Sequence, residues 1–247
     1  MKTYTLAVLQ ARMSSSRLTG KVLMDLNGEA MIYRQISRIM MAKTINEIVV
    51  ATSVHPSDDL LVEFLENHKV RVVRGPLEDV LSRFQLVLTN IACTALIRLT
   101  GDCPLVMPEI IDKMVSHFYD SKVDYLSNAI EPTFPDGLDI EVINPAALEK
   151  LSSFELNSSE REHVTLGLYK RPTEFRIQNY ANSEDFSHMR WTVDYQEDLD
   201  FVRQVYANFI GREATFTYSD LHDFLKQNPQ AISGIDASRR NEQLQKE

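Results

Sequence analysis

Apolar residues follow two regular patterns over the first half of the chain. Four short apolar runs have the length and composition of buried strands: residues 4–9, 47–52, 70–73 and 96–99. Four stretches between and after them repeat apolar residues at helical spacing: residues 32–40, 60–65, 80–88 and 110–118. Strands that alternate with helices predict parallel pairing and right-handed crossovers, so the sequence predicts an α/β fold.

The pattern becomes irregular after residue 125. Residues 127–140 are rich in turn formers. Beyond them we expect short strands at 138–143, 175–178 and 190–193, and helices at 161–169, 199–209 and 220–226. The length of 247 residues fits a single domain. We divide it into a core at about 1–125, an insertion at about 126–190 and a return to the core at 190–247.

Composition excludes several classes of protein. The formal net charge is −9, which argues against a nucleic-acid partner, since such proteins need a broad basic face. The longest apolar runs are far short of a membrane span, and we expect no membrane partner. Cys93 and Cys103 give neither a disulfide framework nor a zinc spacing, so a cytoplasmic location is the simplest expectation.

The loop after the first predicted strand, residues 10–21, gathers positive charge and hydrogen-bond donors. It holds Arg12, Arg17, Lys21 and three consecutive serines. Arginine binds phosphate through a planar fork and lysine through a compact charge, so this set suits a triphosphate. The spacing matches neither the Walker A nor the Rossmann glycine pattern. The alternative interpretation is a solvated basic loop.

A second loop, residues 100–104, also follows a predicted strand, and it contains Asp102. Ligands bind at the carboxyl ends of parallel strands, so we expect the two loops to converge. Asp194 follows the strand-like stretch at 190–193. Magnesium takes one or two carboxylates together with substrate phosphates, so Asp102 and Asp194 are candidate Mg²⁺ ligands. The alternatives are a turn residue for Asp102 and a helix cap for Asp194.

Residues 10–23 resemble the signature loop of the cytidylyltransferases. The similarity is to the branch named after spore-coat polysaccharide synthesis proteins, which is related to the CMP-Kdo and CMP-sialic acid synthetases. Thr19 stands where that family usually has proline, which should loosen the turn. The resemblance covers nearly the whole chain through five further runs: residues 74–84, 98–105, 134–142, 161–165 and 190–199.

The resemblance implies a Rossmann-like, mostly parallel sheet flanked by helices, as in the nucleotide-diphospho-sugar transferases of GT-A type. Residues 1–125 would bind the nucleotide, and residues 126–190 would form a small sugar-binding and dimerisation lobe. A homodimer is expected by the same analogy.

The resemblance and the local sequence together assign candidate site residues. Mg²⁺ would bind Asp102 and Asp194, and the catalytic set would be Arg12, Arg17, Lys21 and Asp102. The nucleotide would contact Gln10, Ala11, Arg12, Ser14, Ser15, Arg17, Lys21, Asp79, Arg83, Arg98, Thr100 and Gly101. The sugar would contact Asp136, Asp139, Glu141, Arg161 and His163.

Purely structural explanations remain open for several of these residues. Asp79 could favour a helix start through the helix dipole. Arg98 lies in a buried strand and could pair with an acid. Asp139 and Glu141 would share one face of an extended stretch, which could be a solvated edge. Arg161 could form a helix-end ion pair.

The function that the resemblance implies is transfer of a cytidylyl group from CTP to a small sugar, acidic or neutral, with release of pyrophosphate, for surface polysaccharide or other glycan synthesis. One alternative is a glycosyltransferase that uses a sugar nucleotide, for which Asp198-Leu199-Asp200 would be the metal motif. That motif falls within a predicted amphipathic helix, and we interpret it as a solvated face. Another alternative is a non-catalytic nucleotide-binding protein. The identity of the sugar stays open.

Overall fold

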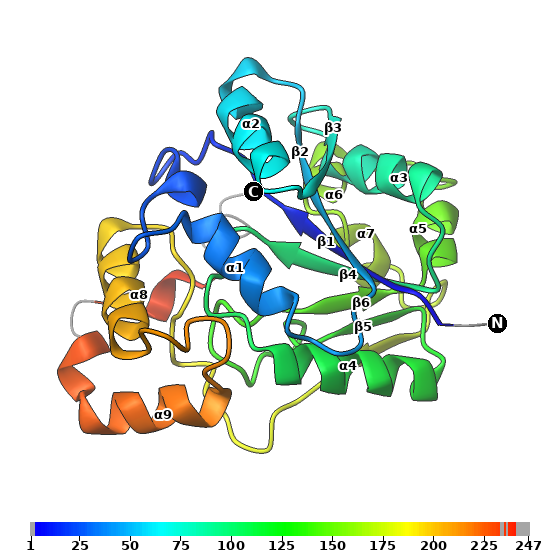
Figure 1. The fold of residues 1–247 in the computed structure, drawn as a ribbon. Helices are drawn as coiled ribbons and strands as arrows, with labels where there is room; N and C mark the ends of the chain where they lie inside the picture. The colour runs from blue at the N-terminus through cyan, green and yellow to red at the C-terminus, as the bar shows by residue number, and fades with distance from the viewer. Residues whose placement is uncertain (1–2, 233–234, 236, 241–247) are drawn as a thin grey trace.

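A computed structural model describes residues 3–232, 235 and 237–240, and it is built around one seven-stranded sheet (Figure 1). The strands are β1 Thr5–Gln10, β2 Glu47–Ser53, β3 Arg71–Gly75, β4 Ala95–Thr100, β5 Tyr125–Ser127, β6 Glu141–Ile143 and β7 Ile177–Asn179. Their order in the sheet is β3-β2-β1-β4-β6-β5-β7. Pairing is parallel except at β6, which runs antiparallel to β4 and β5. The predicted α/β, mostly parallel fold is confirmed.

Helices cover both faces of the sheet (Figure 1). The α-helices are α1 Met31–Ile39, α2 Asp59–Asn67, α3 Val80–Asn90, α4 Pro108–Ser121, α5 Pro145–Leu151, α6 Ser158–Glu162, α7 Leu166–Tyr169, α8 Gln196–Asn208 and α9 Tyr218–Gln227. The short 3₁₀ helices are η1 Lys21–Leu23, η2 Pro56–Asp58, η3 Pro229–Ile232 and η4 Ala237–Arg239.

Side chains of the central strands point alternately to the two faces of the sheet, and each face packs into its own apolar core. Ala7 and Leu9 of β1 face the larger core, which includes the buried faces of α1, α4 and α8. Leu6 and Val8 face the other core, which includes residues of α3, α5 and α7. All four side chains are fully buried, as expected of a strand covered on both faces. The strand that leads into the loop at residues 10–21 is therefore packed against a core on each face of the sheet.

Three local predictions in the second half of the chain were wrong. The helix predicted at 161–169 is broken into α6 and α7, because Val164 lies between them with a positive φ of 42°. The stretch at 190–193 is not a strand, and it makes only one bridge, between Asp136 and Arg190. The strand predicted from residue 138 begins only at Glu141, and β5 and α5 were not predicted.

Residues 126–190, predicted as an insertion, contribute β6, β7 and most of β5 to the same sheet as the amino-terminal half. Residues 190–240 contribute α8 and α9, which pack beside α1 and α4. The last part of that predicted region, 241–247, lies outside the described residues. Within the part of the chain that is described, no helix is both long and apolar enough to cross a bilayer.

Gly137 joins the turn-rich segment to the stretch that ends in Asp194. It has a φ of +102°, and a Cβ placed on it would lie 2.5 Å from the backbone nitrogen of Thr192 and 2.6 Å from the carbonyl carbon of Trp191. Backbone atoms cannot give way as a flexible side chain can, so only glycine fits this contact.

We predict that Gly137→Ala lowers the free energy of unfolding by about 3 kcal/mol, because backbone strain and a steric clash add. Gly211→Ala is the matched control, since Gly211 also has a positive φ (+83°) but open space around it. That variant should lose only about 1 kcal/mol. Urea unfolding measures both, and equal losses would contradict the close approach at Gly137.

Candidate active site

The loops after β1 and β4 meet at the carboxyl edge of the sheet, as predicted. The amide of Gly101 donates to the carbonyl of Gln10 at 2.8 Å. A Cβ on Gly101 would lie 2.9 Å from that of Ala11, so the approach needs glycine. The β1 loop is also held from outside: Asp58, fully buried, accepts a hydrogen bond from the amide of Met13 at 2.7 Å. The sequence analysis did not identify Asp58, which lies just before a helix and has the pattern of an ordinary helix start.

Thr19 does not leave the turn loose. Its hydroxyl donates to the carbonyl of Ser15 at 3.0 Å, and the amide of Gly20 donates to the carbonyl of Met13 at 2.9 Å. Gly20 itself has a φ of +73° and begins η1. These contacts replace the restraint that proline would supply.

Lys21 connects the two candidate metal ligands. Its ammonium group lies 3.3 Å from a carboxylate oxygen of Asp102 and 2.9 Å from one of Asp194, and it donates to the carbonyl of Val193 at 2.7 Å. The lysine is 7% exposed. Burial disfavours its charge, but the two aspartates outweigh burial and raise the pKa of Lys21. Burial alone would raise the pKa of Asp102, but the ammonium group of Lys21 outweighs burial and lowers it.

Asp194 receives two further cations. Arg17 lies 2.5 Å from one oxygen of its carboxylate, and Arg190 lies 2.8 Å from the other. Burial would favour protonation of Asp194, but Lys21, Arg17 and Arg190 together hold its pKa far below the ordinary range. The carboxylate is therefore charged at any physiological pH. The role of helix cap, considered for Asp194, falls instead to Tyr195 at the start of α8.

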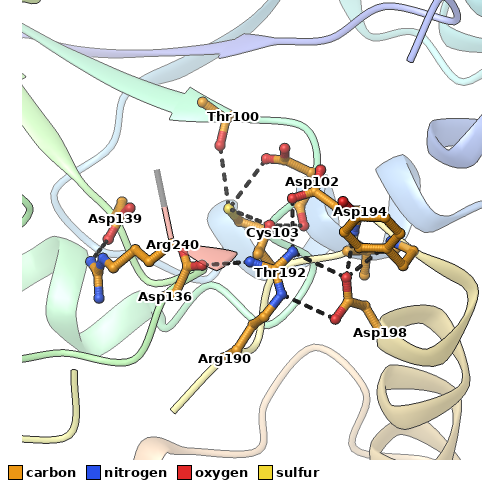
Figure 2. A network of polar contacts seen from close by, with 12 residues as sticks. Thr100, Asp102, Cys103, Asp136, Asp139, Arg190, Thr192, Asp194, Asp198 and Arg240 are labelled. Carbon is orange, nitrogen blue, oxygen red and sulfur yellow. Dashed lines mark hydrogen bonds and ion pairs between the residues drawn. The ribbon is translucent and has the colours of Figure 1, made fainter. Parts of the chain in front are cut away.

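Arg190, which the sequence analysis did not select, is the centre of a buried ionic network (Figure 2). Its guanidinium group donates to Asp136 at 2.8 Å, to Asp194 at 2.8 Å and to Asp198 at 3.1 Å. Only 2% of the arginine side chain is exposed. One arginine thus links the turn-rich segment, the metal-ligand candidate and α8.

The interpretation of the Asp198-Leu199-Asp200 motif as a solvated face was wrong for its first residue. Asp198 is 1% exposed and accepts hydrogen bonds from Arg190 and from the amides of Asp194 and Tyr195. Asp200 is exposed and pairs with Arg203 at 3.3 Å. The two carboxylates therefore do not act together, as an Asp-x-Asp metal motif would require.

Two adjoining cavities open on this edge of the sheet. The first, about 240 Å³, is lined by residues of the β1 loop and its neighbours, among them Gln10, Ala11, Arg12, Ser15, Arg17, Lys21, Arg83, Arg98, Thr100 and Gly101. The second, about 380 Å³, is lined by polar residues that include Arg98, Asp136, Asp139, Glu141, Thr165, Arg190 and Arg239. Asp102, Asp194, Arg17 and His163 line both. We call them the loop cavity and the acidic cavity.

A second ion pair, between Arg98 and Glu141, lines the acidic cavity. Arg98 of β4 donates to Glu141 of β6 and, at 3.0 Å, to the side chain of Gln10. Glu141 also accepts hydrogen bonds from the hydroxyls of Tyr125 and Thr165. Arg98 therefore pairs with an acid, one of the two alternatives considered for it, and it lines both cavities as well.

Three predicted site residues line neither cavity: Ser14, Asp79 and Arg161. Asp79 is the N-cap of α3, where it accepts a hydrogen bond from the amide of Ser82. Arg161 donates to the same carboxylate of Asp79, so both have a structural explanation. Arg83 does line the loop cavity, although its guanidinium group donates to the carbonyls of Pro76 and Leu77.

Cys103 lies between these groups but is not an activated nucleophile. It is buried, and burial together with the nearby charge of Asp102 raises the pKa of its thiol well above the ordinary value. A thiol that stays protonated is a poor nucleophile, so we interpret Cys103 as a packing residue.

Taken together, the site is a polar cleft on an α/β sheet, with a cation-rich loop facing two carboxylates. The loop can bind a polyphosphate, the carboxylates can bind a divalent cation, and the acidic cavity can hold a hydroxylated acceptor. This fold and this site define an enzyme of the nucleotidyltransferase class.

The sequence pattern described as cytidylyltransferase matches residues 6–230, so the chain belongs to the cytidylyltransferase family. It is 34% identical over 241 residues to the spore coat polysaccharide biosynthesis protein SpsF of Bacillus subtilis, covering 94% of this chain and 98% of that protein. A solved cytidylyltransferase from Leptospira borgpetersenii superposes with a TM-score of 0.89 at 31% identity, covering 95% of this chain and 99% of that one. A CMP:2-keto-3-deoxy-manno-octonic acid synthetase in complex with CTP shares the fold, with a TM-score of 0.65, 18% identity and coverage of 83% and 99%.

Asp139 of the acidic cavity should titrate near neutrality. Burial, reinforced by Asp136 and Glu141, raises its pKa to about 7, although Arg240 opposes the rise. A carboxyl group whose pKa is raised on folding stabilises the fold below its unfolded pKa of about 3.9, and this stabilisation is lost as pH rises through 7.

We predict that wild type loses stability relative to Asp139→Asn as pH rises from 5 to 8, because only the aspartate must ionise inside the cavity. Urea unfolding of both proteins across this range measures the difference. A difference that is constant with pH would contradict the raised pKa.

Proposed function

We propose that the protein is a CTP:sugar cytidylyltransferase in which a hydroxyl of the acceptor attacks the α-phosphorus of CTP. The new bond joins that oxygen to phosphorus, the bond from the α-phosphorus to the bridging oxygen breaks, and pyrophosphate leaves. The observation that carries the proposal is the pair of adjoining cavities with Asp102, Asp194 and Arg17 on their shared boundary. Nucleotide and acceptor would meet there, so catalysis rests on positioning and charge neutralisation.

The loop cavity would hold CTP. Arg12, Arg17 and Lys21 supply the cations for the triphosphate, and the β1 loop adds backbone amides and the hydroxyl of Ser15. Thr100, Gly101, Arg83 and Arg98 also line this cavity and would contact the nucleotide. Lys21 and Arg17 pair with carboxylates in the structure, and CTP would draw them towards its phosphates.

The chemistry of Asp102 and Asp194 fits Mg²⁺. Oxygens of both carboxylates approach the single ammonium group of Lys21, so both face one cationic position. Residues 3–232, 235 and 237–240 contain no cluster of three or more His, Cys, Asp or Glu side chains suited to a metal. Magnesium needs no such cluster, because one or two carboxylates suffice when substrate phosphates complete its shell. When bound, the ion would neutralise the triphosphate and the leaving pyrophosphate.

The acidic cavity would hold the acceptor sugar. Its carboxylates at Asp136, Asp139 and Glu141 can accept hydrogen bonds from sugar hydroxyls, and His163 lies on the wall shared with the nucleotide. A volume of about 380 Å³ is in the range of small-molecule sites. The name of the spore coat relative supports an acceptor used in surface polysaccharide synthesis.

The glycosyltransferase alternative is weaker on this geometry. Its metal motif would require both Asp198 and Asp200 at the site, whereas Asp198 is occupied by Arg190 and Asp200 lies on the exposed face of α8. A non-catalytic role would leave the convergence of Lys21, Asp102 and Asp194 without a purpose. We also propose a cytoplasmic homodimer, as the free cysteines and the family analogy suggest.

Asp102→Asn tests the metal-ligand role. We predict that magnesium-dependent pyrophosphate release from CTP and an accepted sugar falls by about 10²–10³-fold, because one anionic ligand is lost and Lys21 loses a partner. Asp223→Asn is the control, since the Asp223 side chain is 62% exposed and lies 3.9 Å from the ammonium group of Lys226. Both variants should show cooperative thermal unfolding, and pyrophosphate release by Asp102→Asn at the rate of the control would rule out the role.

The choice of base is tested by thermal shift with each of the four nucleoside triphosphates in the presence of magnesium. We predict that CTP gives the largest rise in melting temperature, because ligand that binds only the folded state stabilises it by mass action. Equal shifts with all four would mean that only the triphosphate is recognised and would refute the assignment of CTP as the specific donor.

A further inference from the structure

Asp58 is a fully buried carboxylate that is surrounded by neutral hydrogen-bond donors. One of its oxygens accepts from the amide of Met13 at 2.7 Å. The other accepts from the amide of Ser53 and the hydroxyl of Thr52, each at 3.1 Å, and from the hydroxyl of Ser53. Burial would raise the pKa of Asp58, but these hydrogen bonds outweigh burial and lower it. The group is therefore a buried anion stabilised by hydrogen bonds.

The place of Asp58 in the chain would suit a simpler role. It stands at the N-cap of α2, where an aspartate usually accepts a hydrogen bond from an amide of the first turn, a contact worth about 1 kcal/mol. Here the side chain makes no such cap bond. Its carboxylate binds instead the end of β2 and, 45 residues away in the chain, the β1 loop. The stability of α2 does not explain this orientation.

The hydrogen bond from Met13 fixes the point at which the two ends of the β1 loop are tied together. The carbonyl of Met13 accepts from the amide of Gly20 at 2.9 Å, so the backbone of Met13 is held on both sides. Arg12 precedes Met13, Lys21 follows Gly20, and both cations line the loop cavity. Asp58 lines neither cavity, so it acts on these cations through the backbone.

The charge of Asp58 has a second effect beneath the loop. Arg12 and Arg83 both line the loop cavity. Burial lowers the pKa of Arg83, the charge of Arg12 lowers it further, and the charge of Asp58 opposes both. The buried anion thus helps two like charges to share one cavity.

We propose that Asp58 is a positioning residue for nucleotide binding, which holds the β1 loop in the form that receives the triphosphate. The inference rests on the proposed function and extends it to a residue outside both cavities. A loop that is fixed in advance binds its ligand more tightly, because less conformational freedom is lost on binding. Each oxygen of Asp58 accepts from a backbone amide, so the NH₂ group of an asparagine would face the N–H of Met13 or of Ser53 whichever way it turned.

The test compares Asp58→Asn with wild type by isothermal titration calorimetry, with CTP plus magnesium and with inorganic tripolyphosphate as the two probes. We expect the Kd for each probe to rise about tenfold, because the loop must then be ordered as the probe binds. In pyrophosphate release with an accepted sugar, the KM for CTP should rise by a similar factor while the KM for the sugar changes less than about threefold. A mere loss of folded protein would lower kcat and the apparent number of sites but would leave Kd and KM unchanged.

Asp112→Asn is the matched control. Asp112 also accepts from two backbone amides and a threonine hydroxyl: the amide of Lys43 at 3.1 Å, and the amide and hydroxyl of Thr44 at 2.8 and 2.7 Å. These residues lead into β2, at the edge of the sheet opposite the β1 loop. Asp112→Asn should therefore lower the melting temperature but leave both Kd values within about twofold of wild type.

A backbone substitution keeps the test decisive if Asp58→Asn does not fold. An ester in place of the amide between Arg12 and Met13 removes the N–H donor and keeps every side chain. It should raise the Kd for tripolyphosphate about tenfold, whereas the matching ester at the amide of Thr44 should not.

The proposal would be overturned if Asp58→Asn, or the ester at Met13, bound both probes as tightly as its control. Weaker binding of tripolyphosphate by the variant, together with no pyrophosphate release by wild type with any sugar, would uphold the role of Asp58 in the loop and count against the proposed reaction. The two failures are therefore distinguishable.

Discussion

The carboxylate of Asp194 is the point on which the site depends, because three cations from two distant parts of the chain meet on it. Arg17 and Lys21 come from the loop after β1, and Arg190 comes from the stretch that precedes α8. All of these groups are largely removed from water, so the loss of one would leave the others poorly compensated. The charge balance thus fixes the β1 loop against the 190–194 stretch and sets the width of the cleft.

The same balance prepares the site for its ligands. In the structure, Lys21 pairs with the two aspartates, and Arg17 pairs with Asp194. A triphosphate would give these cations new partners, and a divalent cation would give the aspartates one. Binding would therefore exchange ion pairs rather than bury new uncompensated charge, and nucleotide and metal should bind with positive cooperativity. The Arg190 network would hold Asp194 in place throughout, since its other carboxylates, Asp136 and Asp198, do not line the loop cavity.

Local pattern predicts the parallel half of this fold well, because each strand there is a run of buried residues that ends in a distinctive loop. It fails where structure is set by distant partners. β5 is three residues long and is defined only by its neighbours in the sheet. Asp198 has the helical position of a solvated residue, but Arg190 reaches it from outside the helix. Arg239 likewise lies beyond every predicted element, and only the return of the chain brings it to the acidic cavity.

The most direct test of the exchange of ion pairs is a crystal structure with CTP and Mn²⁺, located by its anomalous scattering. We predict one Mn²⁺ bound by carboxylate oxygens of Asp102 and Asp194 and by phosphate oxygens of CTP, with the ammonium of Lys21 moved from the aspartates to the triphosphate. Mn²⁺ bound elsewhere, or Lys21 still bridging the two aspartates beside bound CTP, would contradict this account of the site.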